Sequence, residues 1–291
     1  MGLATPWAPF LWPATRAKGM ASGPAPRRLG KPGYRPSIAA ILGTGMIRIS
    51  LAAALLLTLS CAAPALADIT VFTSGGTNPG LRTLSAAWTA ETGKQVTIVG
   101  GTVTKARDNV KNKVPGDLVV LPLPELTEVA ANLKPAPFTP VGRVNFGLAV
   151  KAGAPHPDIS TLPKFIAVLK GASGVGFTDP ARGSAAGKMV AELLARPDFA
   201  GVKPMPIAGT PGLAIARDGI PYALGPISEE VTVPGVEVVG VMPKEIEMHF
   251  DYTGAVLGYA AQPDEAAAFL AYITRPQARP NWQETGVDNP S

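Results

Sequence analysis

Cysteine and histidine are scarce in this sequence of 291 residues, which has one cysteine and two histidines. The single cysteine, Cys61, has no second cysteine with which to form an intramolecular disulfide. His249 follows Glu245 and Glu247, but in a segment expected to be extended, where the helical spacing common among metal ligands is not available. We therefore expect no disulfide, no thiolate chemistry, no metal and no cofactor.

Catalytic and nucleotide-binding motifs are also missing. The chain has no G-x-S-x-G nucleophile motif, no P-loop and no G-x-G-x-x-G before a predicted helix. After Asp68 it has no uninterrupted run of about 18 apolar residues, the length expected of a membrane-spanning helix. These absences favour a binding protein over an enzyme.

Residues 46–67 have the pattern of a cleavable secretory signal. Arg48 supplies the positive charge, residues 51–59 form a short apolar run, and Ala65-Leu66-Ala67 places small residues at the cleavage site before Asp68. Lipid anchoring at Cys61 is the less favoured alternative. The sequence therefore predicts export to the periplasm.

Residues 1–45 contain no acidic residue and show no helical or strand period. We interpret Met46 as the true start and residues 1–45 as a mis-assigned extension, with a disordered basic arm as the alternative. Seven of the 26 basic residues and none of the 21 acidic residues precede Asp68, so the remainder carries 19 basic and 21 acidic residues, a net charge of −2. The net charge of +5 on the whole chain therefore does not predict a nucleic-acid partner.

Strands and helices are predicted to alternate after Asp68. The predicted strands are 68–72, 95–99 and 117–121, and the predicted helices are 79–92, 103–113 and 124–133. This alternation is typical of βαβ units around a parallel sheet, and therefore of an α/β fold. The length fits one large domain or two lobes of about 100 residues each.

The second half has a longer predicted strand, 143–150, and then a looser alternation. Helices are expected at 159–169, 211–217 and 264–273, and a further helix follows residues 179–188 and runs to about residue 195. Strands are expected at 175–177, 206–207, 222–224, 231–241 and 249–257. If two lobes are present, extended crossings near 137–146 and 248–253 would join them and create a cleft. We predict one lobe from residues 68–142 and 250–291, and a second lobe from residues 143–249.

Small hydroxyl and glycine residues recur where predicted strands lead into predicted helices. They occupy residues 73–77, 100–105 and 181–185. The first N–H groups of a helix are unpaired and lie at its positive end, so that such junctions bind anions. Each junction alone could be an ordinary helix cap, but their recurrence in both halves predicts an anion site between the lobes.

The chain resembles the periplasmic molybdate-binding proteins, which are type II substrate-binding components of ABC transporters. The segments that carry the resemblance are Ile69–Ser74, Pro115–Val120, Gly176–Pro180, Gly183–Gly187 and Arg275–Ala278. The resemblance implies a two-lobed α/β fold of type II, in which each lobe is a mostly parallel sheet flanked by helices and the ligand lies in the cleft between them.

The resemblance also implies a set of ligand contacts. Two positions depart from the family pattern: Lys105 follows the second donor loop, and Gly225-Pro226 stands near the place of a family tyrosine, with Tyr222 offset from it. Lys105 and Arg182 could each pair with a carboxylate or phosphate. The candidate ligand-binding residues are Ser74, Gly75, Thr102, Thr104, Lys105, Arg182, Ser184, Ala185 and Tyr222.

We therefore predict a monomeric periplasmic solute-binding protein that captures a small anion, an organic acid first and molybdate or tungstate next. Its expected partner is the permease of an ABC transporter, or a membrane sensor to which it presents the ligand. The alternative from another class is a secreted enzyme on the same fold, with Asp251, Tyr252 or Glu229 as acid or base.

Overall fold

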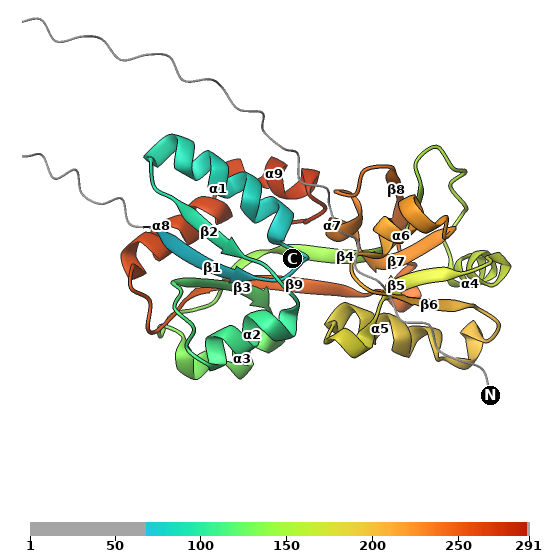
Figure 1. The fold of residues 1–291 in the computed structure, drawn as a ribbon, viewed down its shortest axis with the longest axis horizontal. Helices are drawn as coiled ribbons and strands as arrows, with labels where there is room; N and C mark the ends of the chain where they lie inside the picture. Colours follow the sequence, from blue (N-terminus) through green and yellow to red (C-terminus); the bar gives the residue numbers. More distant parts are fainter. Residues whose placement is uncertain (1–67, 290–291) are drawn as a thin grey trace, which may run out of the picture. The chain divides into compact units, whose positions relative to one another are not determined.

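The computed structural model describes residues 68–289 of the chain (Figure 1). The predicted signal and the extension before it lie outside these described residues. Within them, no helix has the length and apolar character needed to cross a membrane.

The first part of the described chain alternates strands and helices as the sequence predicts. The elements are β1 (Ile69–Thr73), α1 (Asn78–Thr92), β2 (Val96–Val99), α2 (Val103–Lys111), β3 (Leu118–Pro122), α3 (Leu123–Glu128) and a 3-10 turn (Ala130–Asn132). Pro79 stands in the first turn of α1, and Gly93 ends this helix with a φ of 76°, a conformation that glycine adopts without strain.

The second part has more elements than the sequence predicts. They are β4 (Thr139–Lys151), α4 (Leu162–Gly171), β5 (Val175–Thr178), α5 (Ala185–Leu194), β6 (Pro204–Ile207), α6 (Pro211–Asp218), β7 (Tyr222–Pro226), α7 (Ile227–Glu230), β8 (Val236–Val241), β9 (His249–Val256), α8 (Pro263–Thr274) and α9 (Arg279–Glu284). The short helices α7 and α9 are not predicted. The strand predicted over 231–241 begins only at Val236, because Gly235 turns the chain with a φ of 80°.

The strands pair in the order β2-β1-β3-β9-β4-β7-β5-β6, and β8 pairs with β4. Strands β1, β2 and β3 are parallel, as are β5, β6 and β7, whereas β9 and β4 run antiparallel to their neighbours. Because parallel neighbours end at the same edge, the loops that follow β1 and β2 lie together, and those that follow β5 and β7 lie together.

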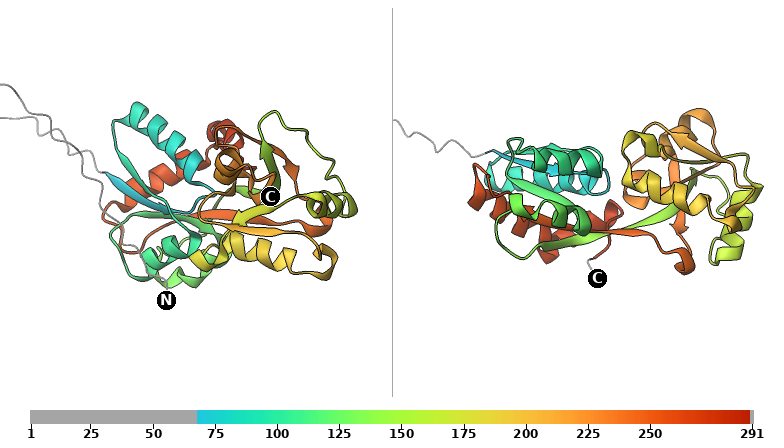
Figure 2. Two further views of the ribbon diagram at one scale, coloured as in Figure 1. Left: turned by 45° about the vertical axis from the view of Figure 1, so that its right-hand side comes forward. Right: turned by 90° about the horizontal axis from the view of Figure 1, so that it is seen from below.

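The described chain has two lobes that share the long strands β4 and β9 (Figure 2). Lobe I contains β1–β3, α1–α3, α8 and α9, and its core clusters include Leu81, Val120 and Phe269. Lobe II contains α4–α7 and β5–β8, and its main cluster includes Phe165 and Leu224. The predicted lobe boundaries fall inside β4 and β9; the residues at which one lobe ends remain a prediction.

A bidentate ion pair joins β4 to β9 where they run between the lobes. The guanidinium of Arg143 donates to the two carboxylate oxygens of Asp251 at 2.7 and 2.9 Å. The C-terminal segment also pairs with β4, because the backbone groups of Arg143 and Asp288 exchange hydrogen bonds of 3.0 and 2.7 Å. Both pairings fix the strands on which the two lobes are mounted.

Candidate functional site

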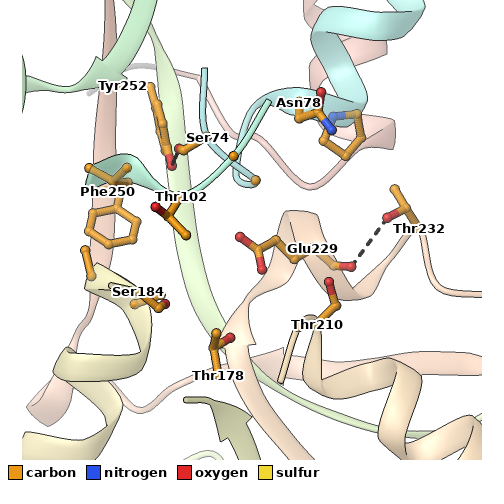
Figure 3. Close-up of a pocket in the computed structure, with 17 residues that line it drawn as sticks. Ser74, Asn78, Thr102, Thr178, Ser184, Thr210, Glu229, Thr232, Phe250 and Tyr252 are labelled. Atoms are coloured by element: carbon orange, nitrogen blue, oxygen red, sulfur yellow. Dashed lines mark hydrogen bonds between the residues drawn. The ribbon is translucent and has the colours of Figure 1, made fainter. Parts of the chain in front are cut away.

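A pocket of about 320 Å³ lies between the lobes (Figure 3). Four helices, each eight residues or longer, contribute residues at or near their N-terminal ends to its wall: Asn78 for α1, Thr102 for α2, Ser184 for α5 and Thr210 for α6. Each N-terminus carries unpaired N–H groups and partial positive charge. Four of them around one cavity make an environment that favours an anion.

The loops after β1 and β2 form the lobe I side of the pocket. The parallel pairing of β1 with β2 brings these loops together, and the N–H of Gly75 donates to the carbonyl of Gly101 at 3.1 Å. The hydroxyls of Ser74 and Tyr252 share a hydrogen bond of 2.7 Å, in which either oxygen can be the donor. The Thr102 hydroxyl accepts from the backbone N–H of Lys105 at 3.1 Å, so both donor groups are held in place.

Lobe II supplies the other side from three segments. Ser184 caps α5, and its hydroxyl accepts from the N–H of Gly187 at 2.9 Å. Thr178 is the last residue of β5, and Thr210 precedes α6 without a side-chain cap bond. The residues that line the pocket include no lysine, arginine or histidine, so neutral donors and helix ends supply its affinity for anions.

One carboxyl group, that of Glu229, also lines this pocket of neutral donors and helix ends. Glu229, on the short helix α7 after β7, points its side chain toward Thr102 and the loop of Ser74 (Figure 3). The loop approaches closely, since a Cβ built at Gly75 would overlap the Oε1 atom of Glu229. Burial raises the pKa of Glu229 to about 7, because desolvation penalises the charged form.

A second carboxyl lies behind Glu229. Glu230 is buried and packs against Gly212, and neither of its carboxyl oxygens has a side-chain partner within the described residues. Burial and then the charge of Glu229 raise the pKa of Glu230 to about 8. Two adjacent carboxyls whose charged forms are disfavoured therefore stand on one short helix.

Five of the nine predicted ligand-binding residues line the pocket: Ser74, Gly75, Thr102, Ser184 and Ala185. The other four do not line it. The Thr104 hydroxyl instead donates to the carbonyl of Gly183 at 3.1 Å and so links lobe I to lobe II. Lys105 and Arg182 are exposed. Tyr222 stands at the beginning of β7, whereas the pocket lies at the end of that strand.

Several lining residues are absent from the predicted set, among them Asn78, Thr178, Thr210, Thr232 and Phe250. Asn78 begins α1, Thr178 ends β5 and Phe250 lies in β9, whereas Thr210 and Thr232 stand in loops. They share no repeated pattern, so the sequence gives no signal for them. Glu229 and Tyr252 enter the sequence reasoning only as acid or base of the enzyme alternative, and both line the pocket. The position of Glu229 soon after the Gly225-Pro226 end of a strand is the signal that could have identified it.

Residues 68–289 contain no group of three or more histidine, cysteine, aspartate or glutamate side chains able to hold a metal. Asp251, the third candidate acid of the enzyme alternative, is paired with Arg143. This hydrogen bond is the main cause of the lowered pKa of Asp251. The chemistry of the pocket therefore depends on neutral donors and on Glu229.

Comparisons with known proteins agree with this geometry. A family model described as bacterial extracellular solute-binding protein matches residues 69–288. An aconitate isomerase from a Pseudomonas species is 27% identical over 234 residues, which cover 78% of this chain and 89% of that protein.

Two solved structures illustrate the similarity of the fold. The periplasmic molybdate-binding protein of Azotobacter vinelandii gives a TM-score of 0.62 at 14% identity, over 77% of this chain and 100% of that one. L-phospholactate-bound PEB3, a Campylobacter jejuni protein, gives 0.57 at 15% identity, over 76% and 100%. These matches confirm the two-lobed type II binding-protein fold that the resemblance implies; at such identities they show the fold alone.

Proposed function

Because the chain belongs to the bacterial extracellular solute-binding proteins, we propose that it captures a small organic acid in the interlobe pocket. The predicted secretory signal supports a periplasmic location, and delivery to the permease of an ABC transporter is the role that such a location and fold favour. A membrane sensor is the alternative recipient of the bound ligand.

One observation carries the proposal: four helix N-termini and several hydroxyls surround a pocket lined by no cationic side chain. Helix ends and neutral donors stabilise an anion through their partial positive charge and their N–H and O–H groups. Donors come from both lobes, including Ser74 and Thr102 on one side and Ser184 and Thr210 on the other. A bound anion therefore stabilises the closed arrangement of the lobes.

The size and walls of the pocket favour an organic acid over molybdate or tungstate. Its volume of about 320 Å³ lies at the lower end of the roughly 300–1,000 Å³ typical of small-molecule sites. Pro79, Val103 and Phe250 add apolar surface to the wall, which a carbon skeleton can contact and a bare oxyanion cannot use. A tetrahedral oxyanion remains the second choice of ligand.

Titration calorimetry with an anion panel tests this proposal. The full precursor is expressed with its own leader, and the protein is purified from the periplasmic fraction; N-terminal sequencing checks the expected start at Asp68. The panel contains trans-aconitate, succinate, phosphate, sulfate and molybdate. Heat with at least one organic acid supports the proposal, heat with molybdate alone refutes the organic-acid preference, and silence with every anion refutes the site.

A matched pair of variants places the ligand in the pocket. Thr210 and Thr161 both precede a helix without a side-chain cap bond, but only Thr210 lines the pocket. Thr210→Ala is expected to weaken binding about fivefold, as loss of one hydrogen bond worth about 1 kcal/mol would. Thr161→Ala should leave affinity unchanged; equal effects of the two substitutions would show that the ligand binds elsewhere.

A second candidate function is isomerisation of an unsaturated organic acid. Glu229 favours it, because a carboxyl with a pKa near 7 can both take and return a proton at neutral pH. The Pseudomonas relative, an aconitate isomerase, points the same way. Glu229 would remove a proton from the carbon that lies between a carboxylate and the double bond. The double bond would shift by one carbon toward that position, and Glu229 would return the proton to the carbon at which the double bond originally ended.

Proton NMR of trans-aconitate in D₂O tests this candidate. Isomerisation by this route predicts a new isomer together with loss of the methylene signal by exchange with solvent. Glu229→Gln, which keeps the shape but cannot accept a proton, should abolish both changes while the protein stays folded. A wild-type protein that binds the acid without either change would leave binding as the function and eliminate the isomerase.

A further inference from the structure

The pocket contains an apparent electrostatic conflict at Glu229. An ionised carboxylate would repel the anion that the four helix ends attract, with a free-energy cost that is large where water is excluded. No lysine, arginine or histidine lines the pocket to offset that charge. Within the described residues, the Glu229 carboxyl also has no side-chain hydrogen-bond partner.

The groups around Glu229 are neutral or oppose its ionisation. The loop of lobe I brings Ser74 and Gly75, both uncharged, against it. On β9, the buried phenol of Tyr252 has a pKa raised by burial and, to a smaller extent, by Glu229 and Glu125. On α7 itself the neighbour is Glu230, whose carboxyl is buried. None of these groups supplies a positive charge to offset ionisation of Glu229, and burial raises its pKa.

We propose, building on the proposed organic-acid binding, that Glu229 is protonated in the complex and donates a hydrogen bond to a carboxylate of the ligand. The anion then binds together with one proton. Glu229 becomes a donor like the hydroxyls around it, and its charge no longer repels the bound anion.

The titration of Glu229 supports this geometry and sets the sign of the effect. Its pKa in the empty pocket is raised to about 7 by burial, and a bound anion raises it further. Below this pKa the carboxyl is already protonated, so affinity is independent of pH. Above it a proton must be taken up on binding, and affinity falls toward tenfold for each pH unit.

Calorimetry over the range from about pH 6 to about pH 9 tests the proposal, with trans-aconitate and succinate as probes because carboxyls of ordinary pKa are ionised across this range. The wild-type Kd is expected to be flat near pH 6 and to rise roughly tenfold per unit above about pH 7.5. Runs in two buffers of different ionisation enthalpy should show uptake of up to one proton.

Two substitutions separate Glu229 from its neighbour. Glu229→Gln keeps a hydrogen-bond donor without a titrating group, so that its Kd should stay within about threefold of the wild-type value at pH 6 and remain flat to pH 9. Glu230→Gln removes the carboxyl that does not line the pocket, and its Kd should retain the wild-type rise. Circular dichroism confirms that both variants are folded.

The outcomes are distinct. A wild-type Kd that does not change with pH, a folded Glu229→Gln protein that loses binding at pH 6, or one that keeps the wild-type rise would each overturn the proton coupling while leaving organic-acid binding intact. Absence of binding by both probes at every pH would overturn the proposed function, and the proton coupling with it.

Discussion

The two sides of the pocket supply similar donors but differ in how firmly they are held. On the lobe I side the hydroxyls of Ser74 and Thr102 already have hydrogen-bond partners within the protein. On the lobe II side the Ser184 hydroxyl is held in the same way, but Thr210 has no cap bond and Glu229 can change its charge. Lobe I therefore offers a preorganised surface, and lobe II carries the group whose state depends on pH.

The largest expected effect concerns the charge on lobe II. Between about pH 4.5 and 7 the folded protein keeps Glu229 protonated while the unfolded chain is ionised, so the raised pKa makes stability fall as pH increases through this window. Glu229→Gln removes this slope. Relative to wild type it should gain up to about 3 kcal/mol in the free energy of unfolding between pH 5 and pH 8.5.

Urea denaturation of the two proteins at each pH measures this difference. Ser160→Ala, at an exposed position that does not line the pocket, is the control. Because Ser160 hydrogen-bonds Lys164 and Asp158, this variant should be offset from wild type by a constant amount at every pH in the range. A constant offset between wild type and Glu229→Gln across the range would show that Glu229 ionises normally in the folded protein.

The next effect tests the close approach of the two sides. Gly75→Ala would place a Cβ against the Glu229 carboxyl, which stands at the end of a flexible side chain and has to leave its position in the pocket. We expect trans-aconitate affinity to fall at least about 30-fold, or roughly 2 kcal/mol. Gly171→Ala is the matched control, because a Cβ there meets nothing within 4 Å.

Calorimetry distinguishes these variants. Unchanged affinity in folded Gly75→Ala would mean that the lobes stand further apart in the complex than in the structure described here.

A smaller effect is expected from the rigid lobe I side. Tyr252→Phe removes the partner of the Ser74 hydroxyl and should lower the free energy of unfolding by about 1 kcal/mol. Tyr259→Phe is the contrasting case, since its hydroxyl is buried without a partner within the described residues and its removal should cost nothing or stabilise. Equal losses in urea denaturation would contradict the idea that the Ser74–Tyr252 pair preorganises this side.

The smallest effect concerns the direct link between the lobes. Thr104→Ala removes the hydrogen bond to Gly183 and should weaken ligand affinity about threefold, because the closed arrangement loses one of its contacts. Thr127→Ala removes a comparable bond within helix α3, to Leu123, and should not change affinity. Small-angle scattering should show a larger radius of gyration for ligand-free Thr104→Ala than for the control. Identical radii of gyration would argue against a role of the Thr104–Gly183 hydrogen bond in holding the lobes together.

The fold was predictable to the extent that periodic patterns encode it. The apolar strand β3 and the helix α1, with Pro79 near its start and Gly93 at its end, were both predicted, because burial and capping leave local signals. Helices α7 and α9 were missed, since four and six residues are too few to show a helical period.

The candidate site likewise contains residues that local sequence patterns indicate and residues whose role depends on the folded structure. Ser74, Thr102 and Ser184 are predicted ligand residues that line the pocket; they lie in the segments that join a predicted strand to a predicted helix, which is a local signal. The position of Glu229 after a strand end is a sequence signal for a ligand site, but its raised pKa and its closeness to Gly75 of the other lobe depend on residues distant in sequence. Lys105 and Arg182 were favoured for their charge, which does not show which way an exposed side chain points.

The strand order also determines when each lobe can be completed. Lobe I begins the described chain, yet its strand β3 pairs with β9, and α8 and α9 cover it from the far end of the sequence. Strands paired across so long a separation form slowly. Lobe II is continuous between β4 and β8 and can assemble first. A chain with this connectivity therefore cannot complete its N-terminal lobe until its last helices, α8 and α9, are in place.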